Sequence, residues 1–306
     1  MTTLVFGHKS PDTDSTGSPI VWAWYLNNIK GIDAKPVLLG EPNTEALFVL
    51  DHWNLDKPEI ITDLPADTDV VIVDTNNPAE LPAGINDANI TGIIDHHRLV
   101  AGLETRGPIE IDIQPLACTA TIMWKKIGKD WAQTPREIKG AALSCILSDT
   151  LEFRSPTTTQ EDRAIAHSIA EELGVNITEY AEKMFAAKSD VSAFSEEELL
   201  RMDSKEFDLE GTGLRVSVLE TTSPAPLLER KDALMAAMPG VAKADGAAEV
   251  LLFIVDILKE EATLLVPNDT VKTIAEKSFG AAVTGDTVVL PGIMSRKKQI
   301  IPSLTM

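Results

Sequence analysis

Aspartate and histidine residues follow apolar runs at four separate places in the first half of the chain. The four segments read GHKSPDTDS from residue 7, IVDTN from residue 72, IIDHH from residue 93 and ILSDT from residue 146. Strands and helices hold the residues at their ends at fixed separations, so such segments can gather carboxylate and imidazole ligands around a metal ion. The residue types and their positions therefore predict a metal site at the rim of a sheet.

Six side chains in these segments are candidate metal ligands. They are His8, Asp12, Asp14, Asp74, His96 and Asp149. A catalytic ion that keeps open positions cannot use so many ligands, so two ions are the economical interpretation. Imidazole together with carboxylates suits Mn²⁺ or Co²⁺ better than Mg²⁺, which prefers oxygen ligands and water.

Each aspartate, taken alone, also has a purely structural interpretation. The aspartates of the first segment could cap the helix that follows it. Asp74 could make a turn, and Asp149 could lie in a frayed helix end. The two imidazoles after Asp95 are harder to explain in this way, because one can enter a site while Asp95 orients a ring through a hydrogen bond.

Three adjacent cations, Arg296, Lys297 and Lys298, lie between apolar residues in the segment SRKKQ. Arginine binds phosphate oxygens in pairs, and lysine acts as a point charge. A solvated basic tail is the alternative, which the flanking isoleucine and methionine residues disfavour. Two ions about 3.5 to 4 Å apart can activate water and hold the oxygens of a phosphoryl group. The two features together favour phosphate chemistry.

The composition is that of a globular chain long enough for two domains, with 306 residues and 44% apolar content. A net charge of −20 would repel nucleic acid on average, so we expect no nucleic-acid partner. No apolar run approaches the roughly 20 residues of a membrane span, and the amino end does not resemble a signal peptide. With Cys118 and Cys145 as its two thiols, we expect a cytoplasmic protein with no disulfide and no membrane partner.

Strand-like and helix-like segments alternate through residues 1–188, which predicts an α/β fold with a doubly wound, mainly parallel sheet. A second, smaller mixed-sheet α/β domain is expected over residues 196–306, with a linker at about 189–195. The expected strands are residues 2–7, 36–39, 70–73, 90–94, 214–220, 249–258, 262–266 and 287–290. The expected helices are a first one capped by Asp14 or Ser15 and ending at Gly31, then 45–53, 121–129, 135–147, 160–173, 177–187, 227–238 and 270–277.

Taken together, these segments resemble the manganese-dependent (family II) inorganic pyrophosphatases of the DHH phosphoesterase superfamily. The resemblance runs through GHKSPDTDS, the strand-end Asp74, IIDHH, PLACTAT, ILSDTLEFRSPT, DSKEF and SRKKQIIP, and SRKKQ is its most specific part. It implies a metal-binding DHH domain, a substrate-clamping domain of the DHHA2 type and a site between them. Two departures are visible: Ser10 stands where the family usually has Asn, and Thr75-Asn76-Asn77 replaces a common His-Asn-Glu.

The resemblance also implies a role for each candidate residue. One ion would be held by His8, Asp12, Asp74 and Asp149, and the other by Asp14, Asp74, His96 and Asp149. His97 would contact the substrate and donate a proton, while Lys205, Arg296 and Lys297 would clamp the phosphates. Lys298 receives no role.

The expected function is hydrolysis of inorganic pyrophosphate to two orthophosphates by a hydroxide that bridges two metal ions. The expected cofactor is Mn²⁺, with two or more divalent ions per subunit, Co²⁺ as a substitute and Mg²⁺ accompanying the substrate. The resemblance implies a homodimer. Two alternatives stay open: a DHH-type phosphodiesterase or exopolyphosphatase, and a metal-dependent sensor that binds a phosphate ligand without hydrolysis.

Overall fold

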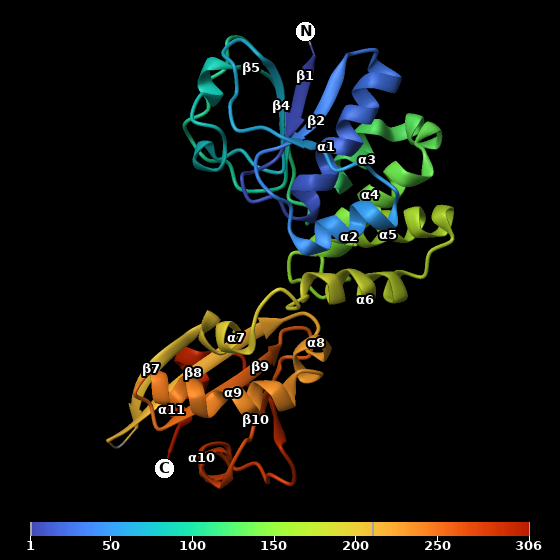
Figure 1. The fold of residues 1–306 in the computed structure, drawn as a ribbon. Helices are drawn as coiled ribbons and strands as arrows, with labels where there is room; N and C mark the ends of the chain where they lie inside the picture. Colours follow the sequence, from blue (N-terminus) through green and yellow to red (C-terminus); the bar gives the residue numbers. More distant parts are fainter. Residues whose placement is uncertain (1, 210, 306) are drawn as a thin grey trace. The chain divides into compact units, whose positions relative to one another are not determined.

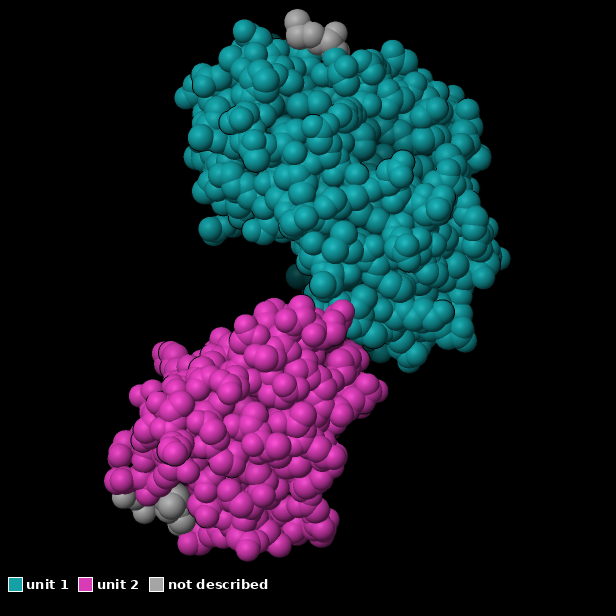
Figure 2. All heavy atoms as spheres, in the orientation of Figure 1, with its two compact units in different colours: residues 1–188 teal, residues 189–306 magenta. Residues whose placement is uncertain are grey.

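The chain forms two compact units, residues 1–188 and residues 189–306, which Figure 2 shows in different colours. The computed structural model describes residues 2–209 and 211–305. Each unit has its own sheet and its own hydrophobic core. Each is therefore an α/β body in itself.

A six-stranded sheet forms the centre of the first unit, in the order β3-β2-β1-β4-β5-β6 (Figure 1). Its strands are β1 (Thr3–Phe6), β2 (Ala34–Leu38), β3 (Glu59–Ile60), β4 (Asp69–Val73), β5 (Asn89–Asp95) and β6 (Glu110–Ile113). Every neighbouring pair is parallel, which confirms the predicted sheet. The sequence pattern does not predict β3 and β6, because both are short and lack the continuous apolar run of a buried parallel strand.

The two faces of this sheet are covered differently. Successive side chains of a strand point to opposite faces, so Val5 and Ile94 pack into the core with the helices, while Phe6, Ile72 and Ile93 pack on the other face against loops with short 3₁₀ turns. The helices are α1 (Thr13–Tyr25), α2 (Thr44–His52), α3 (Thr119–Ile127), α4 (Arg136–Asp149), α5 (Gln160–Leu173) and α6 (Ile177–Lys188), and the turns include η2 (Pro78–Glu80) and η3 (Ile85–Asp87). Burial on both faces holds the strand ends rigidly.

Helix α1 has a different cap from the expected one. Asp12 is the N-cap residue, and its carboxylate accepts a hydrogen bond from the backbone N–H of Ser15 at 2.9 Å. The prediction of a cap at Asp14 or Ser15 is therefore wrong, because Asp12 reaches the free N–H groups of the first turn while Asp14 lies within the helix and is fully buried. The helix continues through a π-helical turn, η1 (Leu26–Lys30), and ends as predicted at Gly31, whose φ of 67° is left-handed.

The second unit is built on a mixed five-stranded sheet in the order β11-β10-β9-β8-β7. Strands β8 and β9 pair in parallel and the other neighbours antiparallel, which confirms the predicted mixed sheet. The strands are β7 (Ser204–Leu209), β8 (Thr212–Thr221), β9 (Glu249–Asp256), β10 (Glu261–Leu265) and β11 (Thr287–Pro291). Helices α7 (Glu196–Met202) and α9 (Lys231–Ala244) cover one face and α10 (Asp269–Phe279) the other, with α8 (Ala225–Leu228), η5 (Arg296–Ile300) and α11 (Ile301–Ser303) as shorter elements.

Both cysteines are free and buried, and neither forms a disulfide. Cys118 precedes α3 and Cys145 lies within α4. Burial raises the pKa of both thiols well above the usual value, so the protonated form of each is favoured. Among the residues that the structure describes, no helix has the length and apolar character needed to cross a membrane.

Candidate metal centre

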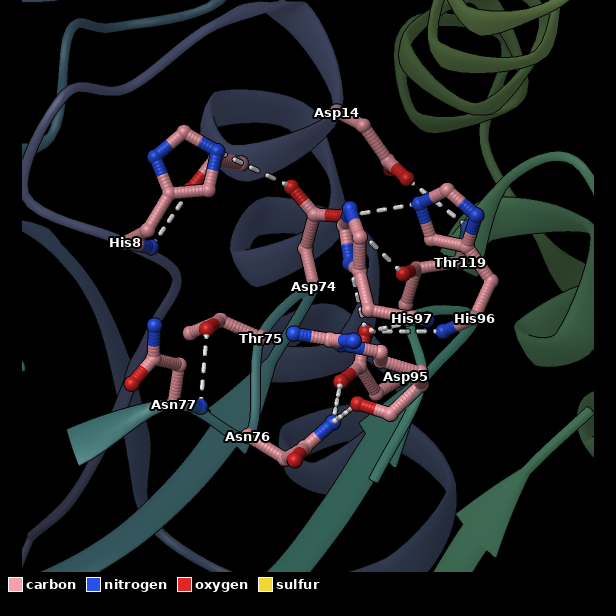
Figure 3. A network of polar contacts seen from close by, with 12 residues as sticks. His8, Asp14, Asp74, Thr75, Asn76, Asn77, Asp95, His96, His97 and Thr119 are labelled. Atoms are coloured by element: carbon pink, nitrogen blue, oxygen red, sulfur yellow. Dashed lines mark hydrogen bonds and ion pairs between the residues drawn. The ribbon is translucent and has the colours of Figure 1, made fainter. Parts of the chain in front are cut away.

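The six candidate ligands come together at the carboxyl ends of neighbouring parallel strands. They are placed as follows: His8 and Asp12 in the loop after β1, Asp14 in the first turn of α1, Asp74 directly after β4, His96 directly after β5, and Asp149 at the last residue of α4. Open parallel sheets gather their ligands at this edge. Figure 3 shows the imidazoles and carboxylates of this cluster pointing toward one another around Asp74.

Asp74 lies between two groups of candidate ligands. Its Oδ2 is 3.5 Å from His8 Nε2, and its Oδ1 is 3.2 Å from His96 Nε2. One ligand atom each from His8, Asp12 and Asp74 lie within 4.8 Å of one another, and the same holds for Asp14, His96 and Asp149. The two groups are therefore each compact enough to surround a cation, with Asp74 in contact with both.

The electrostatics of this cluster favour a bound cation. Burial, together with the charges of Asp14 and Asp12, raises the pKa of both Asp74 and Asp149 well above the usual value. The Oδ2 atom of Asp149 is buried and accepts no hydrogen bond from any described residue. Buried carboxylates that repel one another are costly unless they are paired or coordinate a metal. The donor set, carboxylates with two imidazoles, therefore fits divalent ions of the Mn²⁺ type.

The backbone around the two central carboxylates adopts left-handed conformations. Asp74 has a φ of 58°, and three residues in succession after Asp149, namely Leu151, Glu152 and Phe153, have φ values of 47°, 51° and 70°. A non-glycine residue in this region costs roughly 1 to 2 kcal/mol. Such strain persists only where the surroundings determine the conformation, and here it lies next to the candidate ligands.

Asp14 is held by the amino end of helix α3. Its Oδ2 accepts hydrogen bonds from the backbone N–H of Thr119 at 2.8 Å and from the thiol of Cys118 at 3.3 Å, while Ser18 donates to its Oδ1. The hydroxyl of Thr119 also donates to Asp74 at 3.3 Å. Sequence reasoning gave Thr119 no role, although its place at the start of a helix in PLACTAT is a signal for such contacts.

Asp95 contacts the ring of His97 rather than the ring of the candidate ligand His96. Its Oδ1 lies 2.9 Å from His97 Nδ1 and accepts the backbone N–H groups of residues 96 and 97. The hydrogen bond that the His97 ring donates to the Asp95 carboxylate raises the pKa of His97. The fully buried carboxylate of Asp95 thus orients the largely exposed ring of His97 and favours its protonated form.

The segment Thr75-Asn76-Asn77 forms its own hydrogen-bond network beside the centre. The amide of Asn76, which is buried, donates to Asp95 Oδ2 at 2.5 Å and to the carbonyl of Arg98 at 3.0 Å, and it accepts from Val100 N–H at 2.6 Å. Thr75 and Asn77 both donate to the carboxylate of Glu80. Sequence reasoning gave Asn76 no role, and its signal is an amide two residues after the strand-end Asp74.

The predicted phosphate-binding cations lie in the second unit. Lys205 is on β7 and exposed, and Lys297 is exposed in η5. Arg296 is the most enclosed of the three. Its guanidinium lies 2.7 Å from the backbone carbonyl oxygen of Asp203 and 2.7 Å from Oδ1 of the same residue. Since Asp203 directly precedes β7, this contact brings the DSKEF and SRKKQ segments together. Lys298 is exposed.

Comparison with known families places this site in context. The family described as "DHH family, N-terminal domain" matches residues 2–148, and the "DHHA2 domain" family matches residues 182–306. The fold and the site thus define a two-domain DHH protein. Among curated relatives, the "Probable manganese-dependent inorganic pyrophosphatase" of Lactobacillus johnsonii is 38% identical over 99% of this chain and 97% of the relative. The protein of the same description from Lactobacillus acidophilus is 36% identical over the same shares.

Solved structures agree with these relatives. A putative family II inorganic pyrophosphatase from Methanococcus jannaschii is 33% identical, with a TM-score of 0.61 over 98% of this chain and 97% of that one. An exopolyphosphatase-related protein from Bacteroides fragilis, 13% identical with a TM-score of 0.52 over 98% of this chain and 89% of that one, shares the fold. The chain belongs to the manganese-dependent (family II) inorganic pyrophosphatase family, as the sequence motifs predict.

Proposed function

We propose that this protein hydrolyses inorganic pyrophosphate to two orthophosphates. The observation that carries the proposal is the position of Asp74, whose two oxygens face His8 and His96. Two ligand groups that share one carboxylate can hold two ions close together, the arrangement suited to in-line phosphoryl displacement. The names of the relatives, which describe manganese-dependent inorganic pyrophosphatases, support the same substrate and metal.

We assign the candidate ligands to two Mn²⁺ ions. One would be held by His8, Asp12, Asp74 and Asp149, and the other by Asp14, Asp74, His96 and Asp149. Such ions polarise phosphate oxygens and lower the pKa of water. Co²⁺, which accepts the same ligand types, would substitute, and Mg²⁺ would accompany the substrate.

The chain's own residues would position the substrate and supply a proton. The Asp95 carboxylate holds the His97 ring in one orientation and raises its pKa, so His97 can carry a proton to a phosphate oxygen near neutral pH. In the second unit, the planar guanidinium of Arg296 would bind two phosphate oxygens in place of its contacts with Asp203, and Lys205 and Lys297 would add point charges. These cations would offset the negative charge that develops on the phosphates.

We also propose the organisation of the protein in the cell. It would have a metal-binding domain of residues 1–188 and a substrate-clamping domain of residues 196–306, joined at about 189–195. A division near residue 188 into two compact units, and one family match in each half of the chain, support this organisation. The buried free thiols suit the reducing cytoplasm. We propose a homodimer, which only the family resemblance implies, and light scattering of the purified protein tests it.

Metal reloading tests the proposed function. The protein is treated with a chelator, reloaded with Mn²⁺, Co²⁺ or Mg²⁺, and assayed for phosphate release from pyrophosphate, triphosphate and a dinucleotide. We expect loss of activity on chelation, recovery with Mn²⁺ and preference for pyrophosphate. A preference for the dinucleotide or triphosphate would favour the phosphodiesterase or exopolyphosphatase alternative. Tight pyrophosphate binding without release would favour the sensor.

A further inference from the structure

We propose that a pocket beside the metal centre is a phosphate-binding subsite in which Lys9 and Arg98 contact the anion. The pocket has a volume of about 620 Å³ and is lined by residues that include His8, Lys9, Asn77, Glu80, His97 and Arg98. Its ligand would be orthophosphate or the terminal phosphoryl group of a phosphoanhydride. This inference rests on the proposed function, since pyrophosphate hydrolysis would supply orthophosphate at this place.

The pocket is continuous with the metal centre. His8 and His97 line the pocket, and both also lie against Asp74, with His8 Nε2 at 3.5 Å and His97 Nδ1 at 4.0 Å from its oxygens. Figure 3 shows the His8 and His97 rings next to the Asp74 carboxylate. An anion that leaves the metal centre past these rings would therefore enter the pocket.

The local charge of this pocket is opposite to that of the whole chain. The chain carries a net charge of −20, yet the pocket brings together two permanent cations and one carboxylate, that of Glu80. Glu80 already accepts hydrogen bonds from Thr75 and Asn77. Among the described residues, no carboxylate lies within ion-pair distance of Lys9 or Arg98. Cations left unpaired in a strongly acidic protein are available to an external anion.

Hydrogen bonds hold the backbone of Lys9 and of Arg98 in place, although the two side chains are free to adjust. The buried amide of Asn76 donates to the carbonyl of Arg98 at 3.0 Å. The backbone N–H of Lys9 donates to the carbonyl of Glu80 at 2.9 Å, and a Cβ on Gly40 would come within 2.4 Å of the Lys9 carbonyl. Anchoring of this kind reduces the entropy cost of binding.

The chemistry of the two side chains suits a phosphate dianion. The guanidinium of Arg98 can donate two parallel hydrogen bonds to phosphate oxygens, and the ammonium of Lys9 can add a third donor. The Lys9 ammonium now donates one hydrogen bond, to the carbonyl of Ala79 at 3.5 Å, and an anion would readily replace this carbonyl. Because both cations are solvent-exposed, we expect each to contribute a moderate rather than a dominant part of the affinity.

Orthophosphate binding to the Mn²⁺-loaded protein tests this subsite. We would measure it by calorimetry for the wild type, Arg98→Gln, Lys9→Gln and the conservative Arg98→Lys. The matched control is Lys57→Gln, an exposed lysine of the same unit that pairs with Glu41. We expect the dissociation constant to rise roughly fivefold to tenfold in each glutamine variant, less in Arg98→Lys, and not at all in the control. Glutamine variants that bind orthophosphate as tightly as the wild type would overturn the proposal.

Kinetics separate the two sources of the anion and separate this inference from the proposed function. If orthophosphate inhibition of pyrophosphate hydrolysis weakens in the glutamine variants, the pocket takes the product. If the KM for triphosphate rises more than the KM for pyrophosphate, it takes the end of a longer chain. Normal pyrophosphate hydrolysis with unchanged orthophosphate affinity in the variants would refute the subsite alone. If the wild type does not hydrolyse pyrophosphate, but the variants bind orthophosphate more weakly than the wild type does, the proposed function alone would be refuted.

Discussion

Neutralising Asp149 should stabilise the metal-free protein and weaken its stabilisation by Mn²⁺. In the absence of a cation, Asp149 lies in a buried group of carboxylates whose negative charges repel one another. The substitution Asp149→Asn keeps the size and shape of the side chain and removes its charge. Function and stability therefore make opposite demands on this residue, as they commonly do at active sites.

The magnitude follows from the geometry of the cluster. Carboxylate oxygens of Asp14 and Asp149 lie within 4.8 Å of each other. Two full charges at that separation repel by roughly 3 to 4 kcal/mol at an effective dielectric constant of about 20. In the wild type, burial and the charges of Asp14 and Asp12 raise the pKa of Asp149. This shift favours the protonated form of Asp149 and so already relieves part of the repulsion. We expect a net gain of about 2 kcal/mol, or a rise in Tm of roughly 4 to 8 °C.

Thermal unfolding at pH 8 checks this prediction, with excess chelator in one series and excess Mn²⁺ in the other. Asp149→Asn should unfold at a higher temperature than the wild type with chelator, and it should gain less from Mn²⁺ than the wild type does. Asp63→Asn, which removes an exposed carboxylate of the same unit, should change neither value. A metal-free Asp149→Asn protein that unfolds at or below the wild-type temperature would refute the reasoning.

Three further predictions concern pH and packing. Burial raises the pKa of Asp149 in the folded state, so protonation of this carboxyl stabilises the fold below the unfolded pKa of about 4, and this stabilisation is lost as the pH rises. Urea unfolding of the metal-free protein should therefore show a stability that falls with rising pH more steeply in the wild type than in Asp149→Asn; equal slopes would contradict this. In α4, a Cβ on Gly140 would lie 2.1 Å from the Trp53 ring, so Gly140→Ala should lose about 1 to 3 kcal/mol. Gly240→Ala in α9, where no atom lies within 4 Å of the new Cβ, should gain about 0.5 to 1 kcal/mol in the same thermal assay; the reverse order would contradict the packing. Asn76→Ala removes three hydrogen bonds of a buried amide and should cost roughly 2 to 3 kcal/mol in urea unfolding, whereas a loss below about 0.5 kcal/mol would show that the loop tolerates the change.

The elements that carry the candidate ligands could be predicted because their signals are local. Continuous apolar runs before Asp74 and Asp95 mark buried parallel strands, and a helical pattern ends at Asp149. Strand β7, which carries Lys205, could not be predicted in this way. Its sequence SKEFDL has three exposed charged residues and a single buried position, and it is held by pairing with β8 rather than by its own apolar content.

The sequence by itself determined the family, the α/β class, and the six side chains that could act as metal ligands, because residue type and periodicity are properties of short segments. Only the tertiary structure decided what those side chains touch. Asp14 meets the backbone of Thr119, which is 105 residues away, and Asp95 orients His97 rather than His96. Contacts between distant segments depend on how strands stack and helices pack, and the left-handed backbone of Leu151, Glu152 and Phe153 is of a kind that persists only where the surrounding structure determines it. No local pattern contains that information.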